Sequence, residues 1–317
     1  MNPVITVSPD LCIKCAKCVR LCPAYIFSSG DEPPKAPLSE PPRVVNEEAC
    51  IRCGHCVAVC PTDAISHSGF QVAKDPTEFS VARSMTAGVN VISPIAESPE
   101  GEDAWEAFQR LLKQRRSVRV FQEKAVERET LAKIVEAGQT APSATNRRGT
   151  FWTVATNPGV LREVITLTTE FLEASCKRLR SAPARVLAIC FPGSEAGVYR
   201  SKLPMMESLL NIAQTRDVIL RGAPSLLIAH YDPKDGRFAD PDAQLAIQNA
   251  TLAAVALKLG TFYTGFVTRA ADSDPRIAKT LSIPAHHRIA GGMAVGYADV
   301  KYRYAIHREY PSVMWIE

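Results

Sequence analysis

Apolar residues in the last two thirds of the chain alternate between helical and strand-like patterns. They recur at helical spacing over residues 105–112 and again over 131–135, where Gly138 is expected just beyond the helix end. The elements predicted after these are a strand at 151–155, a helix from 158 into the 170s, a strand at 185–191, a helix around 205–221, a strand at 225–230, a helix at 242–259 and a strand near 289–296. Strands separated by long helices indicate an α/β layered domain with a central mixed sheet and flanking helices.

The N-terminal third has a different pattern. Residues 66–101 lack strong periodicity and are rich in serine, proline and glycine, which is typical of a linker. The proline-rich stretch 30–43 is expected to form an extended surface loop. We therefore predict an α+β protein with a small domain over 1–70, a linker over 71–102 and the layered domain over 103–317.

Composition narrows the class of protein. The 317 residues are 46% hydrophobic and 22% charged, as in soluble globular proteins, and no apolar run is long enough to span a bilayer. The net charge of +4 is mild and the basic residues are dispersed, so nucleic acid is not an expected partner. Only Cys176 and Cys190 lie outside two cysteine motifs, and Cys190, in the apolar run 186–191, is expected to be a buried core residue.

The two cysteine motifs share the spacing C-x2-C-x2-C-x3-C-P. The first comprises Cys12, Cys15, Cys18 and Cys22, and the second comprises Cys50, Cys53, Cys56 and Cys60. Three thiolates at this spacing can hold three corners of an iron–sulfur cube, and the fourth ligand then comes from the other motif. The spacing predicts two 4Fe-4S clusters, one on Cys12, Cys15, Cys18 and Cys60 and the other on Cys50, Cys53, Cys56 and Cys22.

Structural zinc and disulfides are the alternatives for these cysteines. A zinc site uses two C-x2-C pairs and gains nothing from a third cysteine three residues further on. Cys12 comes too early for a secretory signal peptide to precede it. We therefore expect a cytoplasmic protein, in which clustered cysteines indicate metal sites.

The first seventy residues resemble bacterial-type two-cluster ferredoxins. The resemblance rests on the cysteines together with Cys-Pro-Ala-Tyr-Ile at 22–26 and Cys-Pro-Thr-Asp-Ala-Ile at 60–65. The sequence departs from the pattern at Ala16, which stands where the second repeat has Gly54, and at the insertion 30–43. Neither departure removes a cysteine.

Three polar segments of the second domain form a set. They are Arg-Arg-Ser-Val-Arg at 115–119, Ala-Pro-Ser-Ala-Thr-Asn at 141–146, and Val-Gly-Tyr at 295–297 followed by Lys301 and Arg303. Guanidinium groups beside a hydroxyl can clamp a phosphate, although an arginine pair at a helix end is more often solvated surface. Together the segments resemble the nitroreductase family of flavin enzymes over about residues 105–310.

This resemblance implies a flavin mononucleotide (FMN) bound at the interface of an intertwined homodimer. It places Arg115, Arg116, Ser117, Arg119, Lys301 and Arg303 at the phosphate and ribityl end, Ser143 and Asn146 at the ring and ribityl oxygens, and Tyr263, Thr264 and Gly265 where a backbone amide approaches N5. It also implies a mobile lid within 193–216, for which a packed surface helix is the alternative.

The stretch 147–152 departs from the family pattern, because many members have Gln-Pro-Trp soon after the asparagine. Arg147 and Arg148 stand there instead, and we expect them to stabilise an anionic reduced flavin or to attract an acidic substrate. His286 and His287 are left out of the site, one as a surface-loop residue and the other packed beside the last strand.

These features predict an iron–sulfur flavoprotein reductase that passes electrons from two clusters to FMN and then to a small organic acceptor. By resemblance the acceptor is nitroaromatic or quinone-like, and no catalytic side chain is assigned because the flavin carries the chemistry. Reduced ferredoxin or a similar carrier is the expected donor, since no Gly-x-Gly-x-x-Gly follows a strand. The alternatives are an electron-transfer module of a larger redox complex, and a reductase of halogenated or enone substrates.

Overall fold

The computed structural model describes residues 4–28, 36–72, 90–94, 103–191, 193–306 and 311–316. The chain forms two units, Met1–Gln114 with Val300–Glu317, and Arg115–Asp299. The chain end therefore groups with the N-terminal unit rather than with the predicted domain 103–317, because β11 (Tyr304–Ile306) pairs with β6 (Asn90–Pro94). Much of the predicted linker 71–102 lies outside the described residues. No helix among the residues described is long and apolar enough to cross a membrane.

The first unit is a small α+β fold with an internal repeat. Its remaining elements are β1 (Ile5–Val7), α1 (Lys17–Leu21), β2 (Phe27–Ser28), β3 (Arg43–Val44), η1 (Glu47–Ala49), α2 (His55–Val59), β4 (Ile65–His67), β5 (Phe70–Val72) and α4 (Ala104–Gln114). Strands β1 and β4 pair antiparallel, as do β2 and β3, while β11, β6 and β5 form a three-stranded sheet. The helices α1 and α2, one from each cysteine motif, pack against each other.

The two cysteine loops repeat the same backbone conformation. The residues that precede α1 and α2, Ala16 and Gly54, both adopt the left-handed region, with φ of 59° and 69°. A Cβ on Gly54 would come within 2.9 Å of the Phe70 ring, so this position requires glycine for space as well as for conformation. Ala16 adopts the same conformation at a cost of about 1 kcal/mol or more.

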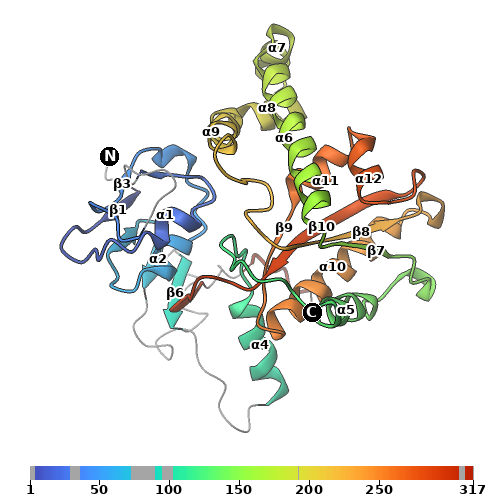
Figure 1. Ribbon diagram of the computed structural model, residues 1–317, viewed down its shortest axis with the longest axis horizontal. Coiled ribbons are helices and arrows are strands. Elements are labelled where there is room, and N and C mark those ends of the chain that lie inside the picture. Colours follow the sequence, from blue (N-terminus) through green and yellow to red (C-terminus); the bar gives the residue numbers. More distant parts are fainter. Residues whose placement is uncertain are drawn as a thin grey trace. The chain divides into compact units, whose positions relative to one another are not determined.

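The second unit is built on a four-stranded sheet in the order β7 (Phe151–Ala155), β8 (Ser225–Tyr231), β10 (Arg288–Gly296), β9 (Gly260–Tyr263). These four strands pair antiparallel, and a parallel bridge joins Ser117 to Thr261 of β9. Helices α5 (Arg128–Gln139) and α10 (Ala239–Ala256) cover one face, and α6 (Pro158–Arg180) and α11 (Gly265–Ala271) cover the other (Figure 1). The predicted layered arrangement is therefore present.

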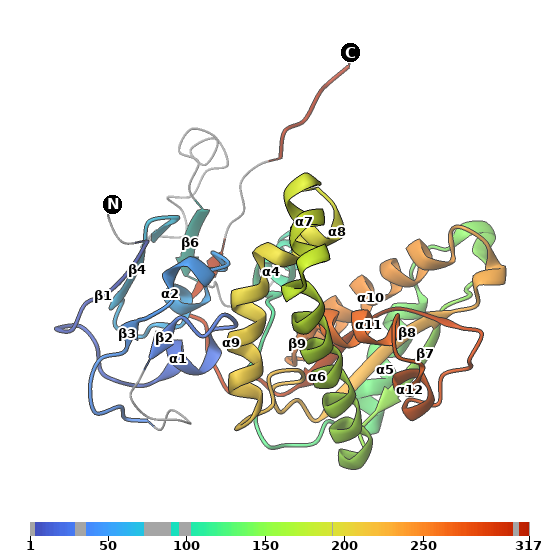
Figure 2. The same cartoon turned by 90° about the horizontal axis from the view of Figure 1, so that it is seen from above.

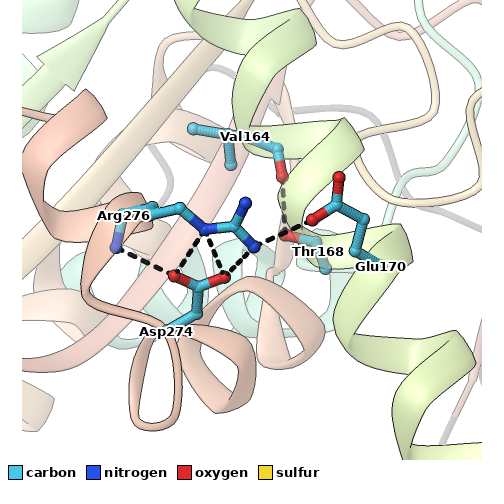
Figure 3. A network of polar contacts seen from close by, with 5 residues as sticks. All are labelled: Val164, Thr168, Glu170, Asp274 and Arg276. Atoms are coloured by element: carbon cyan, nitrogen blue, oxygen red, sulfur yellow. Dashed lines mark hydrogen bonds and ion pairs between the residues drawn. The ribbon is translucent and has the colours of Figure 1, made fainter.

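The remaining elements of this unit lie around the sheet. They are η3 (Ala144–Asn146), α7 (Ala182–Cys190), α8 (Glu195–Ser201), α9 (Leu203–Ala213), η4 (Pro233–Asp235) and α12 (Pro275–Thr280). Helix α9 runs alongside α6 (Figure 2). Arg276 of α12 joins Asp274, 2.7 Å away, to Glu170 of α6, 2.8 Å away (Figure 3). The Arg276 hydrogen bond lowers the pKa of Asp274, whose carboxylate also caps α12.

The prediction of a strand at 185–191 is wrong, because this segment is the helix α7. The Ser181 side chain caps it and Pro183 lies in its first turn, both of which favour a helix start. A short continuous apolar run does not by itself distinguish a buried strand from a helix. Helix α7 has no buried residues, so Cys190 is exposed rather than buried in the core as predicted.

Gly138 was expected just past the end of a helix, but it lies within α5. A Cβ at this position would come within 2.6 Å of Cζ2 of Trp152 on β7. The glycine therefore allows the indole ring to pack directly on the helix backbone, which is a packing role rather than a capping role.

Candidate functional site

The eight motif cysteines surround two separate cavities of the first unit. Cys12, Cys15, Cys18 and Cys60 line one cavity, and Cys22, Cys50, Cys53 and Cys56 line the other. Each set combines three cysteines of one motif with the last cysteine of the other motif. The cysteines are therefore grouped as the spacing predicts, and the binding of a 4Fe-4S cluster by each group stays a prediction.

The thiols in each set are close enough to influence one another. Burial, and then the charges of Cys15, Cys60 and Cys12, raise the pKa of Cys18 to about 12. Burial also raises the pKa of Cys56, as do the thiols of Cys53 and Cys22. Crowded, buried thiols of this kind become thiolates when a cation compensates their charge, as cluster iron does.

Polar hydrogens lie close to the sulfur atoms. The amide of Ala64 donates to Sγ of Cys60 over 3.2 Å. The ring of His67 accepts from the amide of Gly69 through Nδ1, which assigns its proton to Nε2, 3.6 Å from Sγ of Cys50. Such donors tune the reduction potential of a cluster. The sequence did not single out His67, because nothing in its spacing relates it to the cysteines.

The C-terminal segment 300–306 packs on the same unit. The backbone amide of Arg303 donates to the carbonyl of Ala58 over 3.0 Å, and its guanidinium donates to the carbonyls of Cys60 and Pro61. Lys301 and Arg303 thus belong to a different unit from Arg115–Arg119. The expectation that they share a phosphate with that segment stays a prediction.

In the second unit, the basic segment 115–119 lies along β9. Ser117 bridges to Thr261, and the amide of Val118 donates to the Thr261 carbonyl over 3.0 Å. Gly260 is needed here because a Cβ on it would meet the Val118 side chain at 2.7 Å. Pairing with β9 therefore fixes the backbone that carries Arg116, which is buried, and Arg119, which is partly buried.

The end of β9 and the start of α11 contain the three residues expected near N5, Tyr263, Thr264 and Gly265. The amide of Thr264 donates to the Gly292 carbonyl over 2.8 Å, so this amide is already committed. Gly265 is the first residue of α11, where backbone amides have no partner within the helix. The Thr264 hydroxyl is buried and has no hydrogen-bond partner among the described residues, and the same is true of Thr261.

The asparagine loop 143–150 is held in shape by neighbouring side chains. Asp242 of α10 accepts the amide of Ala144 over 3.0 Å, and the hydroxyl of Ser143 accepts the amide of Arg148 over 2.9 Å. Asn146 has a φ of 54° and its Oδ1 accepts from Nε of Arg148 over 3.3 Å. The side-chain nitrogen of Asn146, Nδ2, is a donor that can bind a ligand.

Comparison with known proteins identifies both units. Residues 112–297 match the nitroreductase family, and residues 4–69 match a 4Fe-4S dicluster domain. The chain belongs to the nitroreductase family. It carries an N-terminal 4Fe-4S dicluster domain, so the predicted fusion of a ferredoxin-type domain with a nitroreductase domain is confirmed.

Solved nitroreductases are similar to this chain at low sequence identity. A nitroreductase with bound FMN from Desulfitobacterium hafniense is 20% identical, with a TM-score of 0.49, and covers 66% of this chain and 97% of its own. One with bound FMN from Bacteroides fragilis is 23% identical, with a TM-score of 0.47, and covers 66% of this chain and 98% of its own. No curated protein matches the chain.

Two cavities of the nitroreductase domain lie outside the cysteine sites. One of about 250 Å³ follows the asparagine loop and is lined by Thr145, Arg147 and Phe238, among others. Another of about 840 Å³ is lined mainly by apolar side chains of α6, α7 and α9. Its lining residues include Tyr199 and Met206, which fall in the segment predicted as a lid, but α8 and α9 make this segment mostly helical.

Proposed function

We propose that this nitroreductase-family oxidoreductase passes electrons from two 4Fe-4S clusters to FMN and then to a small organic acceptor, nitroaromatic or quinone-like. The observation that carries the proposal is the pair of cavities, each lined by four cysteines, in a chain that also contains a nitroreductase domain. Clusters transfer one electron at a time, so a cluster domain in the same chain as a nitroreductase domain supports an internal electron supply.

The cysteine geometry suits iron–sulfur clusters better than zinc. Each cavity draws its fourth cysteine from the other motif, a sharing that two independent C-x2-C zinc sites do not need. His67 and the amide of Ala64 lie beside the sulfur atoms of Cys50 and Cys60, as expected of groups that stabilise cluster thiolates.

The residues around β9 fit an FMN. Arg115 and Arg119 would hold the phosphate through charge-assisted hydrogen bonds, and Ser117 would bind the ribityl chain. The buried hydroxyls of Thr261 and Thr264 lack partners among the described residues, and a polar ligand beside β9 would satisfy them. FMN, when bound, supplies the exchange between one-electron and two-electron chemistry.

The asparagine loop would contact the flavin ring. The Nδ2 group of Asn146 and the hydroxyl of Ser143 are donors, and the first amide of α11, that of Gly265, is the free amide candidate for N5. Arg147 pairs with Asp235 at 2.9 Å, so its charge is already compensated. We infer that Arg148, held to Asn146, is the arginine that stabilises negative charge on the ring or on an acidic substrate.

The distinction between an enzyme and a relay module depends on the space above the flavin. An open pocket beside Asn146 and Tyr263 would favour an enzyme, because a pure electron-transfer module needs no space there for an organic molecule. The cavity of about 250 Å³ on the asparagine loop is lined by Thr145 and Arg147 and does not distinguish the two. Reduction of halogenated or enone substrates uses the same cofactor set and stays open as the alternative within the enzyme class.

The experiment that tests the proposal is anaerobic reduction with dithionite, followed by stopped-flow mixing with nitroarenes, quinones, enones and halogenated aromatics. We expect a nitroarene or quinone to reoxidise the flavin fastest. With reduced ferredoxin as the donor, a Cys18→Ala variant should retain FMN but turn over more slowly, because one cluster is lost. If no acceptor reoxidises the flavin faster than buffer alone does, the proposed enzymatic activity is wrong, and an electron-transfer module of a larger redox complex becomes the better proposal.

A homodimer and a cytoplasmic location complete the proposal. Helix α7 exposes large apolar side chains, with Val186 61% and Ile189 78% exposed, and such a surface is typical of an interface. Sedimentation of the purified protein should give a dimer, and Ile189→Asp should weaken it. A wild-type monomer at micromolar concentration would contradict the homodimer.

A further inference from the structure

Three side chains of the second unit that can ligate a metal lie together at one end of the central sheet. They are Asp232, His286 and His287, and their ligand atoms all lie within 4.8 Å of one another. Strands β8 and β10 pair Tyr231 with Arg288, so the antiparallel register places Asp232, just after β8, beside the two histidines just before β10. We propose that these three residues form a binding site for a divalent transition metal ion, with zinc as the best-suited ion.

A chain of hydrogen bonds prepares His287 for this role. Nδ1 of His287 lies 2.8 Å from Nδ1 of His230, and Nε2 of His230 lies 3.3 Å from the hydroxyl oxygen of Thr153. When His230 donates from Nε2 to Thr153, its Nδ1 is free to accept the proton of Nδ1 of His287. This assignment, made from the hydrogen bonds, leaves a lone pair on Nε2 of His287. Metal-bound histidines are typically oriented by such a partner on the other ring nitrogen.

Aromatic packing restrains the same rings. The Phe151 ring stacks on His230 at a centroid distance of 5.9 Å and contacts His287 at 4.8 Å. The rings of His286 and His287 meet edge to face at 4.6 Å. The buried His230 and the partly buried His287 are thus held in place, while His286, with 60% of its side chain exposed, can rotate.

The donor set decides which ions fit. Two imidazoles and one carboxylate suit zinc and its neighbours in the first transition row, whereas magnesium and calcium take oxygen ligands. Ligands about 2.1 Å from a tetrahedral ion are roughly 3.4 Å apart, so these atoms must draw together by a small rotation. Nε2 of His286 is already 3.7 Å from Oδ2 of Asp232. Three protein ligands leave the fourth position to water or another small ligand.

An ion here would join the ends of β8 and β10 to the asparagine loop. Asp232 leads into η4, whose Asp235 pairs with Arg147 at 2.9 Å and lies 2.7 Å from the position of a Cβ on Gly149. Binding of the ion therefore restrains the segment that positions this loop. The inference does not depend on FMN or on the clusters.

The test is zinc binding to the cluster-loaded holoprotein, without a histidine tag and under anaerobic conditions. A Cys190→Ser background removes the exposed thiol that lies outside the two motifs. In the cluster-loaded protein the eight motif cysteines would bind iron and so would not compete for zinc. Isothermal titration with zinc chloride should show one equivalent bound. In this background His287→Ala and Asp232→Asn should each weaken binding at least tenfold, and the matched exposed carboxylate variant Asp272→Asn should bind as the parent does.

A second variant separates a built site from a chance cluster. Thr153→Val removes the group that orients His230 without touching a ligand, and we expect it to weaken zinc binding by about tenfold. Far-UV circular dichroism and iron content check that each variant is folded. The proposal is overturned if no equivalent of zinc binds, or if His287→Ala and Asp232→Asn bind it as tightly as the parent.

Discussion

Arg303 has two competing assignments, and its replacement by alanine distinguishes them. The family resemblance gives this residue to the FMN phosphate, whereas the structure shows its guanidinium donating to the carbonyls of Cys60 and Pro61, with Asp63 3.5 Å away. A hydrogen bond from a charged donor contributes about 1.5 to 3 kcal/mol, and an exposed ion pair contributes up to about 1. The side chain is 45% exposed, so water replaces part of what is lost.

We therefore expect Arg303→Ala to destabilise the backbone around Cys60 by about 1.5 kcal/mol, which is roughly a tenfold change in the local opening equilibrium. The assay is the anaerobic decay of cluster absorbance in excess iron chelator, with retained flavin measured by fluorescence after gel filtration. Decay should be about tenfold faster and FMN should be retained. Arg43→Ala is the matched control, because Arg43 is an exposed arginine of the same unit that forms an ion pair with Glu40. Unchanged cluster decay together with loss of FMN would refute this reasoning and would support the assignment of Arg303 to the FMN phosphate.

Three further predictions concern the cluster loops and the sheet. His67→Phe removes the donor near Cys50 and should make the reduction potential of the cluster at Cys50 more negative by on the order of 40 mV, equivalent to about 1 kcal/mol. Redox titration followed by electron paramagnetic resonance measures this potential, and the other cluster serves as the internal control. Gly138→Ala should lower the free energy of unfolding of the second unit by about 1 kcal/mol, since overpacking against Trp152 costs about 1 to 3 kcal/mol and the higher helix propensity of alanine returns about 1 kcal/mol. Urea unfolding followed by tryptophan fluorescence tests this. The control Gly193→Ala should have no effect, because a Cβ there meets nothing within 4 Å. Gly54→Ala should shorten the lifetime of the clusters, whereas Ala16→Gly should leave it equal or longer, because only the first adds a methyl group against the Phe70 ring; equal effects of the two variants would contradict this.

The grouping of the cysteines could be predicted because three of the four cysteines in each group come from one short motif and the two motifs repeat the same spacing. Spacing within each motif brings three thiols together in one loop, and the internal repeat places the fourth thiol of each motif at the cavity of the other motif. The strands of the second unit were also predicted where their flanking turns were clear, as for β7, β8 and β10. Helix α7 was missed, since an apolar run of this length has no period and its exposure depends on what packs against it.

The metal-ligating cluster and the destination of the chain end could not be predicted, because both depend on strand pairing between distant segments. His286 and His287 were noticed, but only the β8–β10 register places Asp232 and His230 next to them. Likewise, nothing in Lys301 or Arg303 indicates that β11 returns to β6. In both cases the residues can be identified in the sequence, but the distant segment with which they pack cannot.

The return of the chain to the first unit changes how the two halves must be separated. The polypeptide leaves this unit at Gln114 and re-enters it at Val300, so the nitroreductase domain is inserted into the cluster-bearing unit rather than appended to it. Removing residues 1–102 would leave β11 without β6, and ending the chain at Asp299 would remove Tyr304, whose hydroxyl donates to Asp63 over 2.8 Å. The first truncation leaves β11 without its partner strand, and the second removes a contact of the unit that carries the cysteines. Point variants of the cysteines are therefore the sounder way to interrupt the electron supply while leaving the nitroreductase domain unchanged.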